Sequence, residues 1–304
     1  MVRIDQLTST ARQFVTVRAD GRALPDHAPG SHVVVTAGSK RNAYSLTGSG
    51  IAPAEFRFSV LRRGDGGGSD WLHDNVAVGD TLRIEGPTSA FAPEFSARMA
   101  LLIAAGIGVT PVLSHLRAAR AWGRDVEVVY GYRAGAAAHL EEVRELAGPH
   151  LREAVGRQAL HEVLRERLED QPWGTHAYAC GPPAVLDLFE QQAHRAGWPP
   201  ARVHLERFVA PELDAGRAFT AVLQRSGKQL QVPSGTSLLE AALAADVPIA
   251  NMCRQGVCGQ CVVAVTAGRV EHRDAVLTPE ERETHTQMLA CVSRAADDRL
   301  EIDA

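Results

Sequence analysis

The stretch "CRQGVCGQC", residues 253–261, places three of the five cysteines of this chain within nine positions. Thiols this close together admit four chemical explanations: a disulfide knot, a zinc site, a redox dithiol or an iron–sulfur cluster. Chance clustering of small buried residues is a fifth. The spacing is C-x4-C-x2-C, and a further cysteine, Cys291, follows 30 positions after Cys261.

The spacing separates these explanations. The cysteine count is odd and the start, "MVRIDQLTST", has no apolar signal segment, which disfavours a disulfide scaffold. Zinc ribbons use two short C-x2-C pairs, and a thioredoxin-type dithiol needs no fourth cysteine. The plant-type [2Fe–2S] pattern is this spacing plus one distant cysteine, and Gly256 and Gly259 allow the tight turns that such a loop needs. The predicted ligands of one [2Fe–2S] cluster are Cys253, Cys258, Cys261 and Cys291.

Length and charge bound the remaining possibilities. The chain has 304 residues, enough for two or three domains with separate cores. Its net charge of -4 argues against nucleic acid or an anionic membrane as the main partner. No run of eighteen apolar residues is present to span a bilayer. We expect a cytoplasmic protein that acts as a monomer.

The chain shows three successive sequence patterns. Residues 1–97 read as short strands between Gly and Pro turns, which predicts an antiparallel β-barrel. Residues 98–210 alternate apolar strands with helices, which predicts a doubly wound parallel α/β sheet. Residues 211–217 read as a linker, and residues 218–304 as an α+β domain with a hairpin, a helix and the cysteine loop.

Two tight turns follow strands of the expected parallel sheet. "IAAGIGVTP", residues 103–111, places two glycines between a buried strand and a helix, where backbone N–H groups can bind phosphate. "ACGPP", residues 179–183, follows a later strand. Turns at the carboxyl ends of parallel strands converge on one crevice. Read alone, each is an ordinary strand–helix turn, and Cys180 is a small buried side chain.

These turns, with "VVYGYR" between them, resemble those of the ferredoxin–NADP reductase superfamily. The resemblance implies that the first turn receives the pyrophosphate of a pyridine dinucleotide. It also implies that Cys180 is a catalytic residue near the nicotinamide ring. The dinucleotide contacts that follow from it are Gly106, Gly108, Thr110, Pro111, Cys180, Gly181 and Pro182.

The segment "RNAYSL", residues 41–46, is similar to the Arg-x-Tyr-Ser flavin signature of that superfamily, although two residues instead of one separate Arg41 from Tyr44. The resemblance implies that Tyr44 packs on the flavin ring and that the Ser45 hydroxyl is a catalytic group near flavin N5. It also implies a cation on the flavin phosphate. Arg41 is expected in that role, with Asn42 as the alternative occupant of its place.

A glycine-rich segment follows, "RRGDGGGSDWLHD", with three consecutive glycines before Ser69. Read alone it is a flexible loop, but beside "YSL" it resembles the family's Gly-Gly-Ser loop, whose backbone N–H groups bind phosphate. Phe208 in "HLERF" matches the position of an aromatic residue against the flavin. The flavin contacts implied are Arg41, Tyr44, Ser45, Leu46, Gly66, Gly67, Gly68, Ser69 and Phe208.

Residues 218–304 resemble plant-type ferredoxins of β-grasp fold, and the domain order of the whole chain resembles the phthalate dioxygenase reductase family, which includes vanillate demethylase reductases. The resemblance implies a reductase that passes electrons from NADH through FMN and a [2Fe–2S] cluster to a separate terminal oxygenase of Rieske type. A flavin is needed between the two, because hydride carries two electrons together and an iron–sulfur centre accepts one at a time.

The identities of the flavin and of the nicotinamide rest on weaker signals. An FAD-using branch resembles phenylacetyl-CoA oxygenase reductases and needs more chain for the adenosine half, whereas only about ten residues separate Phe208 from the ferredoxin hairpin. This favours FMN. NADPH would call for cations near the ribose phosphate, but the only one here is Arg133, which ends "VVYGYR", and the following "AGAAAHLEE" turns acidic, which favours NADH.

Two other functions stay open at this point: a reductase for a cytochrome P450, and a non-catalytic redox or cluster carrier of the same fold. The ferredoxin third is the acidic part of the chain, since residues 213–304 hold 12 Asp or Glu against 9 Lys or Arg, a difference of -3 out of the total of -4. This predicts electrostatic steering toward a basic patch on the acceptor.

Overall fold

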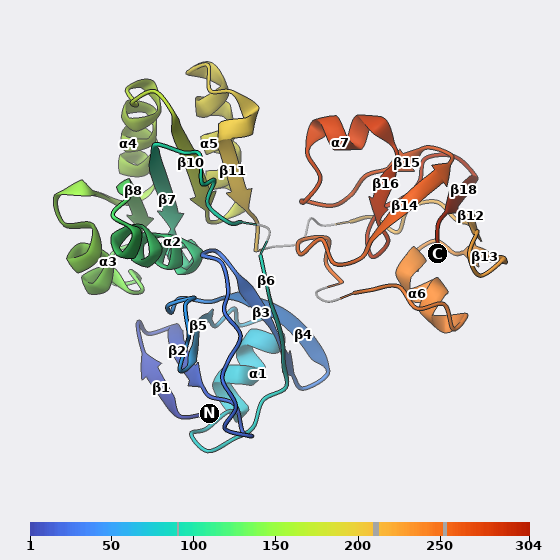
Figure 1. The fold of residues 1–304 in the computed structure, drawn as a ribbon, viewed down its shortest axis with the longest axis horizontal. Helices are drawn as coiled ribbons and strands as arrows, with labels where there is room; N and C mark the ends of the chain where they lie inside the picture. Colours follow the sequence, from blue (N-terminus) through green and yellow to red (C-terminus); the bar gives the residue numbers. More distant parts are fainter. Residues whose placement is uncertain (90, 209–212, 252–253) are drawn as a thin grey trace. The chain divides into compact units, whose positions relative to one another are not determined.

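The structure is a computed structural model, and it describes residues 1–89, 91–208, 213–251 and 254–304. The chain divides into two compact units, Met1–Phe208 and Val209–Ala304, called unit 1 and unit 2 below (Figure 1). The boundary predicted near residue 97 falls inside unit 1, between two different sheets. No helix among the described residues is both long and apolar enough to cross a membrane.

The first part of unit 1 is the predicted antiparallel barrel. Its six strands form two sheets of three, in the orders β1-β2-β5 and β4-β3-β6, and a bridge between Leu46 and Phe58 joins them. A core that includes Phe14, Phe58 and Leu72 fills the interior. The elements are β1 (Arg3–Gln6), β2 (Ala11–Thr16), β3 (His32–Ala37), β4 (Lys40–Ser45), β5 (Phe56–Leu61), α1 (Gly68–Asn75) and β6 (Ile84–Thr88).

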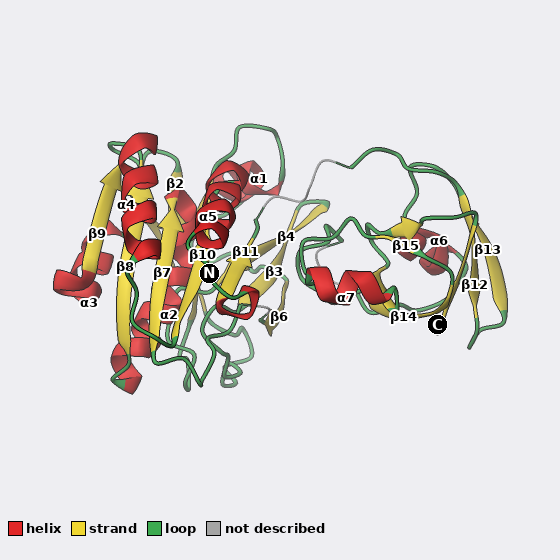
Figure 2. Cartoon of the chain, turned by 90° about the horizontal axis from the view of Figure 1, so that it is seen from above, coloured by secondary structure: helices red, strands yellow, loops and turns green. Residues whose placement is uncertain are grey.

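The second part of unit 1 is the predicted doubly wound sheet, with parallel strands in the order β11-β10-β7-β8-β9. Alternate residues of β7 face opposite sides, so Leu102 packs with α2 and α3 and Leu101 packs with α4 and α5. Figure 2 shows helices on both sides of the strands. The elements are β7 (Met99–Ala105), α2 (Val109–Trp122), β8 (Asp125–Tyr132), α3 (Leu140–Ala147), β9 (Leu151–Val155), α4 (Arg157–Glu169), β10 (Thr175–Cys180), α5 (Pro183–Arg195) and β11 (Val203–Glu206).

Unit 2 has the predicted β-grasp order, β13-β12-β18-β14-β16, in which the first and last strands, β12 and β18, are parallel neighbours. Capping boxes start both helices, with Ser237 and Glu240 on α6 and with Thr278 and Glu281 on α7. The elements are β12 (Phe219–Leu223), β13 (Lys228–Val232), α6 (Leu238–Ala244), β14 (Val262–Ala267), β15 (Val270–Glu271), α7 (Pro279–Thr284), β16 (Gln287–Leu289), β17 (Arg294–Ala295) and β18 (Arg299–Ile302).

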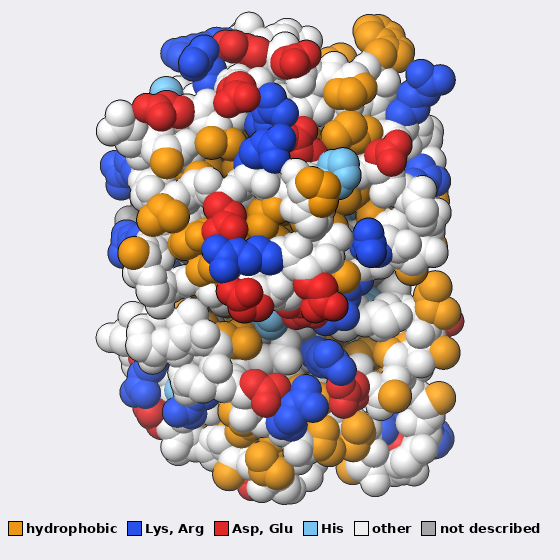
Figure 3. Space-filling view, turned by 90° about the vertical axis from the view of Figure 1, so that its left-hand side faces the viewer, with side chains coloured by type: hydrophobic (Ala, Val, Ile, Leu, Met, Phe, Trp, Pro, Cys, Tyr) orange, Lys and Arg blue, Asp and Glu red, His pale blue; other side chains and the backbone are white. Residues whose placement is uncertain are grey.

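On the face of unit 1 that Figure 3 shows, Lys and Arg side chains are interspersed with Asp and Glu side chains. This face therefore has no broad region of a single charge. This agrees with the small net charge of the chain, and it offers no basic stripe on that face for a nucleic acid backbone.

Candidate functional site

The cysteine loop of unit 2 is built from tight turns. Arg254, Gly256 and Gly259 all have positive φ, at 58°, 73° and 73°. Glycine is required at position 256 for two reasons: its φ is positive, and a Cβ there would lie 2.7 Å from Cγ2 of Val292. The backbone between the cysteines therefore curls back on itself, as a loop that wraps a compact inorganic centre must.

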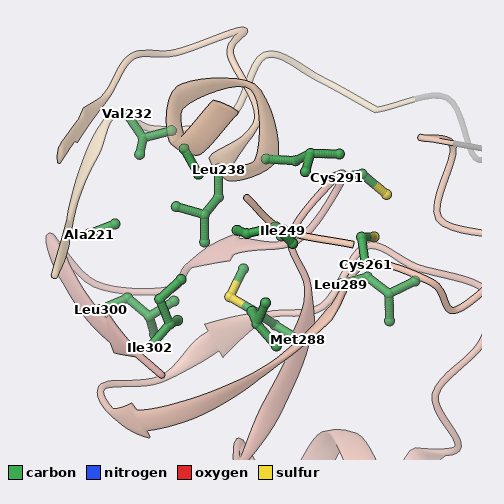
Figure 4. Close-up of a cluster of buried hydrophobic side chains, with 14 of the residues drawn as sticks. Ala221, Val232, Leu238, Ile249, Cys261, Met288, Leu289, Cys291, Leu300 and Ile302 are labelled. Atoms are coloured by element: carbon green, nitrogen blue, oxygen red, sulfur yellow. The ribbon is translucent and has the colours of Figure 1, made fainter. Parts of the chain in front are cut away.

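Three of the four predicted cluster ligands, Cys258, Cys261 and Cys291, are buried, and Cys253 lies outside the described residues. The N–H of Ala290 donates to the carbonyl of Cys261 at 3.0 Å, which brings the loop next to the Cys291 turn. Figure 4 shows the sulfur atoms of Cys261 and Cys291 projecting to the same side of the hydrophobic core. Buried thiol donors on glycine turns fit an iron–sulfur cluster. The described residues alone bring no three His, Cys, Asp or Glu side chains together as a metal site.

The predicted flavin residues lie on β4 and on the first turn of α1. Tyr44 stacks on Phe58 with ring centroids 5.6 Å apart, and burial raises the pKa of its hydroxyl. The hydroxyls of Tyr44 and Ser69 are both buried and have no hydrogen-bond partner among the described residues. Buried polar groups are normally satisfied, so these two are positioned to receive a ligand. A flavin with polar ring edges and a phosphate fits that requirement.

Arg41 lies on the opposite face of β4 from Tyr44, because neighbouring strand residues alternate. Its guanidinium forms an ion pair with Glu85 on β6. Asn42, the alternative in the sequence, shares the face of Tyr44, and its Oδ1 would lie 2.4 Å from a Cβ at Gly68. The structure thus brings Asn42, rather than Arg41, beside the glycine loop.

The glycine loop is folded around Asp70. Its carboxylate accepts the N–H groups of Arg63, Gly64 and Gly66 at 2.7 to 3.0 Å, and these bonds hold the pKa of Asp70 below its usual value. The segment that reads as a flexible loop turns into α1 at Gly68. The N–H groups of Gly66 and Gly67 donate to Asp70 and Asp65, whereas Ser69 lies in the first turn of α1, where N–H groups can bind an anion.

The two turns of the parallel sheet touch each other. Cys180 pairs in register with Ala104, and a Cβ on Gly108 would lie 2.2 Å from the carbonyl oxygen of Cys180. Gly181 packs equally closely, since a Cβ there would lie 2.7 Å from Cβ of Ala105. Thr110 and Pro111 are buried in the first turn of α2, and Pro182 is the N-cap of α5. The predicted dinucleotide residues therefore share one edge of the sheet.

Glu206 is the residue that the sequence reasoning missed. The Ser45 hydroxyl donates to its carboxyl at 3.4 Å, and Glu206 pairs with Cys180 across β10 and β11. Burial raises the pKa of Glu206 to about 8, against a lowering by the Ser45 hydrogen bond. Burial and the nearby Glu206 both raise the pKa of the Cys180 thiol. Ser45, Cys180 and Glu206 thus join the end of β4 to the turn that follows β10.

Phe208 follows two residues later and is partly buried. Its neighbour Arg207 forms ion pairs with Asp187 and Glu190 on α5, which hold this end of unit 1 against that helix. The only sequence signal for Glu206 was an acidic residue at the carboxyl end of a short strand, "VHLE", at the edge where ligands bind in such sheets.

Comparisons with known proteins cover the whole chain. Residues 221–296 match the family model of the 2Fe-2S iron-sulfur cluster binding domain, and residues 86–203 match that of the dimethylamine monooxygenase subunit DmmA-like N-terminal domain. The heme-dependent oxidative N-demethylase beta subunit of Ectopseudomonas mendocina (strain ymp) is 40% identical, over 99% of this chain and 96% of the relative. The carnitine monooxygenase reductase subunit of Escherichia coli (strain K12) is 37% identical, over 99% and 96%.

Solved structures give the same picture. Phthalate dioxygenase reductase is 29% identical with a TM-score of 0.72, covering 100% of this chain and 96% of that one. An intact type IV self-sufficient cytochrome P450 monooxygenase is 32% identical with a TM-score of 0.87, and the match covers 100% of this chain. This chain spans only 40% of that longer protein.

Proposed function

This chain belongs to the phthalate dioxygenase reductase family of oxygenase reductase subunits, and we propose that it takes electrons from NADH on FMN and delivers them through the cluster of Cys253, Cys258, Cys261 and Cys291 to an oxygenase on a separate chain. It is an oxidoreductase with a flavin and a [2Fe–2S] cluster as cofactors. When bound, the flavin accepts two electrons together and releases them singly. We further propose that the protein acts as a monomer in the cytoplasm.

The observation that carries the proposal is the contact between the two sites of unit 1. Ser45 ends the strand that holds Tyr44, and it reaches Glu206 beside Cys180 of the nicotinamide turn. A dinucleotide bound at the Gly106–Gly108 turn and a ring packed on Tyr44 would meet at these three side chains. Their role is to hold the two rings in register and, at Glu206, to keep a proton in the crevice up to about pH 8.

NADH is favoured over NADPH by the side chains that follow β8. Arg133 is exposed there, whereas Arg144 is engaged by Glu141 and Glu153 at 2.7 Å each. His139 is bound to Ser59 at 2.8 Å. A ribose phosphate needs a cluster of available cations. Of these side chains, only Arg133 is an available cation. Comparing kcat/KM for NADH and NADPH tests the assignment, and a preference for NADPH would overturn it.

The flavin identity is tested by extraction. FMN is favoured because so little chain separates Phe208 from β12. Denaturing the purified protein and separating the released flavin should give FMN at one per chain. Recovery of FAD would reject only the choice of FMN. Absence of any flavin would reject the assignment of Tyr44, Ser45, Leu46 and the Gly66–Ser69 loop as flavin contacts.

The acceptor is proposed as a terminal oxygenase of Rieske type, with a haem-dependent oxygenase such as a cytochrome P450 as second candidate. The second is favoured by the relative named as a subunit of a heme-dependent N-demethylase and by the match within a cytochrome P450 chain. Mixing the NADH-reduced protein with a purified oxygenase of each class separates the two. Productive transfer appears as bleaching of Rieske absorbance or as a shift of the haem band.

Glu206→Gln is expected to remove a pH dependence from the stability of unit 1. Burial raises the pKa of Glu206 from 4.5 to about 8, so between these values the folded chain keeps a proton that the unfolded chain has lost. The stability of the wild type is therefore complete below pH 4.5 and falls as the pH rises through 8. All four tryptophans lie in unit 1, so urea unfolding followed by their fluorescence reports on this unit. A difference between the two proteins that is constant across this range contradicts the prediction.

Electron transfer to the acceptor is expected to slow at high salt. The -3 charge of residues 213–304 should steer unit 2 toward a basic patch, and such steering is screened beyond about 8 Å at physiological ionic strength. In stopped-flow experiments the transfer rate should fall several-fold with salt, while NADH reduction of the flavin changes much less. A transfer rate that does not change with salt concentration would indicate that the two proteins dock by shape complementarity instead.

A further inference from the structure

Asp274 is a buried carboxylate beneath the cysteine loop of unit 2. Its side chain is 0% exposed. Oδ1 accepts the N–H groups of Val276 and Leu277 at 3.0 and 2.8 Å. Oδ2 accepts the Ser293 hydroxyl at 3.4 Å. A carboxylate taken fully out of water is costly unless every lone pair is used, so this set of donors indicates a specific role.

These bonds join three segments that are far apart in the sequence. The N–H of Ala275 donates to the carbonyl of Gly256 at 2.9 Å, inside the cysteine loop. Ser293 lies in the turn that contains Cys291, and its oxygen also accepts the N–H of Arg273 at 3.2 Å. The turn at Asp274 is therefore hydrogen-bonded both to the cysteine loop and to the turn that contains Cys291.

Apolar packing completes the arrangement. Leu277, whose N–H bonds to Asp274, lies in the same hydrophobic core as Cys261 and Cys291. A Cβ on Gly256 would lie 3.4 Å from Cα of Asp274, and one on Gly259 would lie 3.5 Å from Cγ1 of Val276. The 274–277 turn thus lies next to both glycine turns of the loop.

An arginine and a histidine face the carboxylate, and burial lowers the pKa of His272, so Arg282 is the cation of the two near neutral pH. Arg282 on α7 lies 3.7 Å from Oδ1 and donates to the Asp274 carbonyl at 2.6 Å. Nδ1 of His272 lies 3.7 Å from Oδ2, and the His272 ring stacks on His285. The charge of Asp274 is consequently only partly offset, at a buried position one hydrogen bond from the cysteine loop.

We propose that Asp274 is a positioning residue for the cluster: it holds the Gly256 turn against the Cys291 turn, and its negative charge keeps the reduction potential of the cluster low. The inference rests on the proposed assignment of the four cysteines as ligands. Fixed charge and hydrogen bonding near a cluster set its potential, and here both come from one side chain.

Two substitutions separate the two roles. In Asp274→Asn, Oδ1 can still accept from Val276 and Leu277 and the amide can donate to Ser293, so the turn is kept and only the charge is lost. The midpoint potential of the cluster should become more positive, with little change in the reduced-state EPR line shape. In Asp274→Ala the acceptors are lost, and cluster release to a chelator should speed up about tenfold. Asp298→Asn and Asp298→Ala, on the exposed surface of the same unit, are the matched controls and should behave as the wild type.

The outcomes are distinct. A more positive potential in Asp274→Asn together with faster cluster release in Asp274→Ala supports the proposal. A wild-type potential in Asp274→Asn overturns the charge role even if Asp274→Ala fails to fold, and a wild-type release rate in a folded Asp274→Ala overturns the positioning role. A wild-type chain without any [2Fe–2S] EPR signal would instead refute the cysteine assignment on which the inference rests.

Discussion

Replacing Cys291 by Ser is expected to abolish the [2Fe–2S] cluster and, with it, all one-electron transfer to the oxygenase. Thiolates hold the irons in plant-type centres, and Cys291 comes from a different segment than the 253–261 loop, so no neighbouring cysteine can replace it. Iron content, the visible absorbance of the cluster and the EPR signal of the reduced protein are the measurements. NADH should still reduce the flavin, because the proposed flavin and nicotinamide residues lie in unit 1.

Cys180→Ser is the reciprocal control, since Cys180 ends β10 of unit 1 and belongs to the proposed nicotinamide site. It should retain the full cluster and lose rate only at the NADH step. The ligand assignment fails if Cys291→Ser keeps the iron and spectra of the wild type.

Gly108→Ala is expected to slow NADH reduction of the flavin by about a hundredfold, because the new methyl group must displace the Cys180 turn. Its Cβ would lie 2.2 Å from the Cys180 carbonyl oxygen and 2.8 Å from the Gly181 nitrogen, and both are backbone atoms that cannot rotate away. A displacement of about 1 Å at a reacting centre can cost on the order of a hundredfold in rate. The overlap should also destabilise unit 1 by about 1–3 kcal/mol. Rapid-mixing absorbance and urea unfolding measure the two effects.

Gly48→Ala is the matched control in the same unit, because a Cβ there meets only side-chain carbons of Arg57 at 3.9 to 4.0 Å. It should leave the stability of unit 1 within error. Wild-type hydride transfer in Gly108→Ala would show that the two turns do not form one crevice.

Local sequence signals were enough for the overall architecture. "MALLIAA" is apolar throughout because β7 is covered by helices on both faces, and the alternation of such strands with helices predicts the doubly wound sheet. The short edge strands β9 and β11 gave no such signal, since most of their residues stay partly or fully exposed. The apolar stretch around Cys291 is not one strand, because the turn that contains Cys291 separates β16 from β17.

Contacts between distant segments could not be predicted. The Ser45–Glu206 hydrogen bond joins residues 161 positions apart, and no pattern around either residue indicates the other. The segment that begins with the last glycine of the run, Gly68–Asn75, is a helix, because Leu72 is buried and Asp70 holds the preceding loop. Which of Arg41 and Asn42 lies beside the glycine loop depends on the side of β4 that each occupies, and the spacing of the motif alone does not give that.

The most direct test of the account is anaerobic stopped-flow absorbance of the cofactor-loaded protein mixed with NADH. The account predicts that the flavin band bleaches first and the cluster band follows, within one chain and without an added carrier. In Cys291→Ser only the first phase should remain, and in Gly108→Ala both should slow together. A flavin that becomes fully reduced while the wild-type cluster stays oxidised, or a cluster reduced without the flavin, would contradict the account.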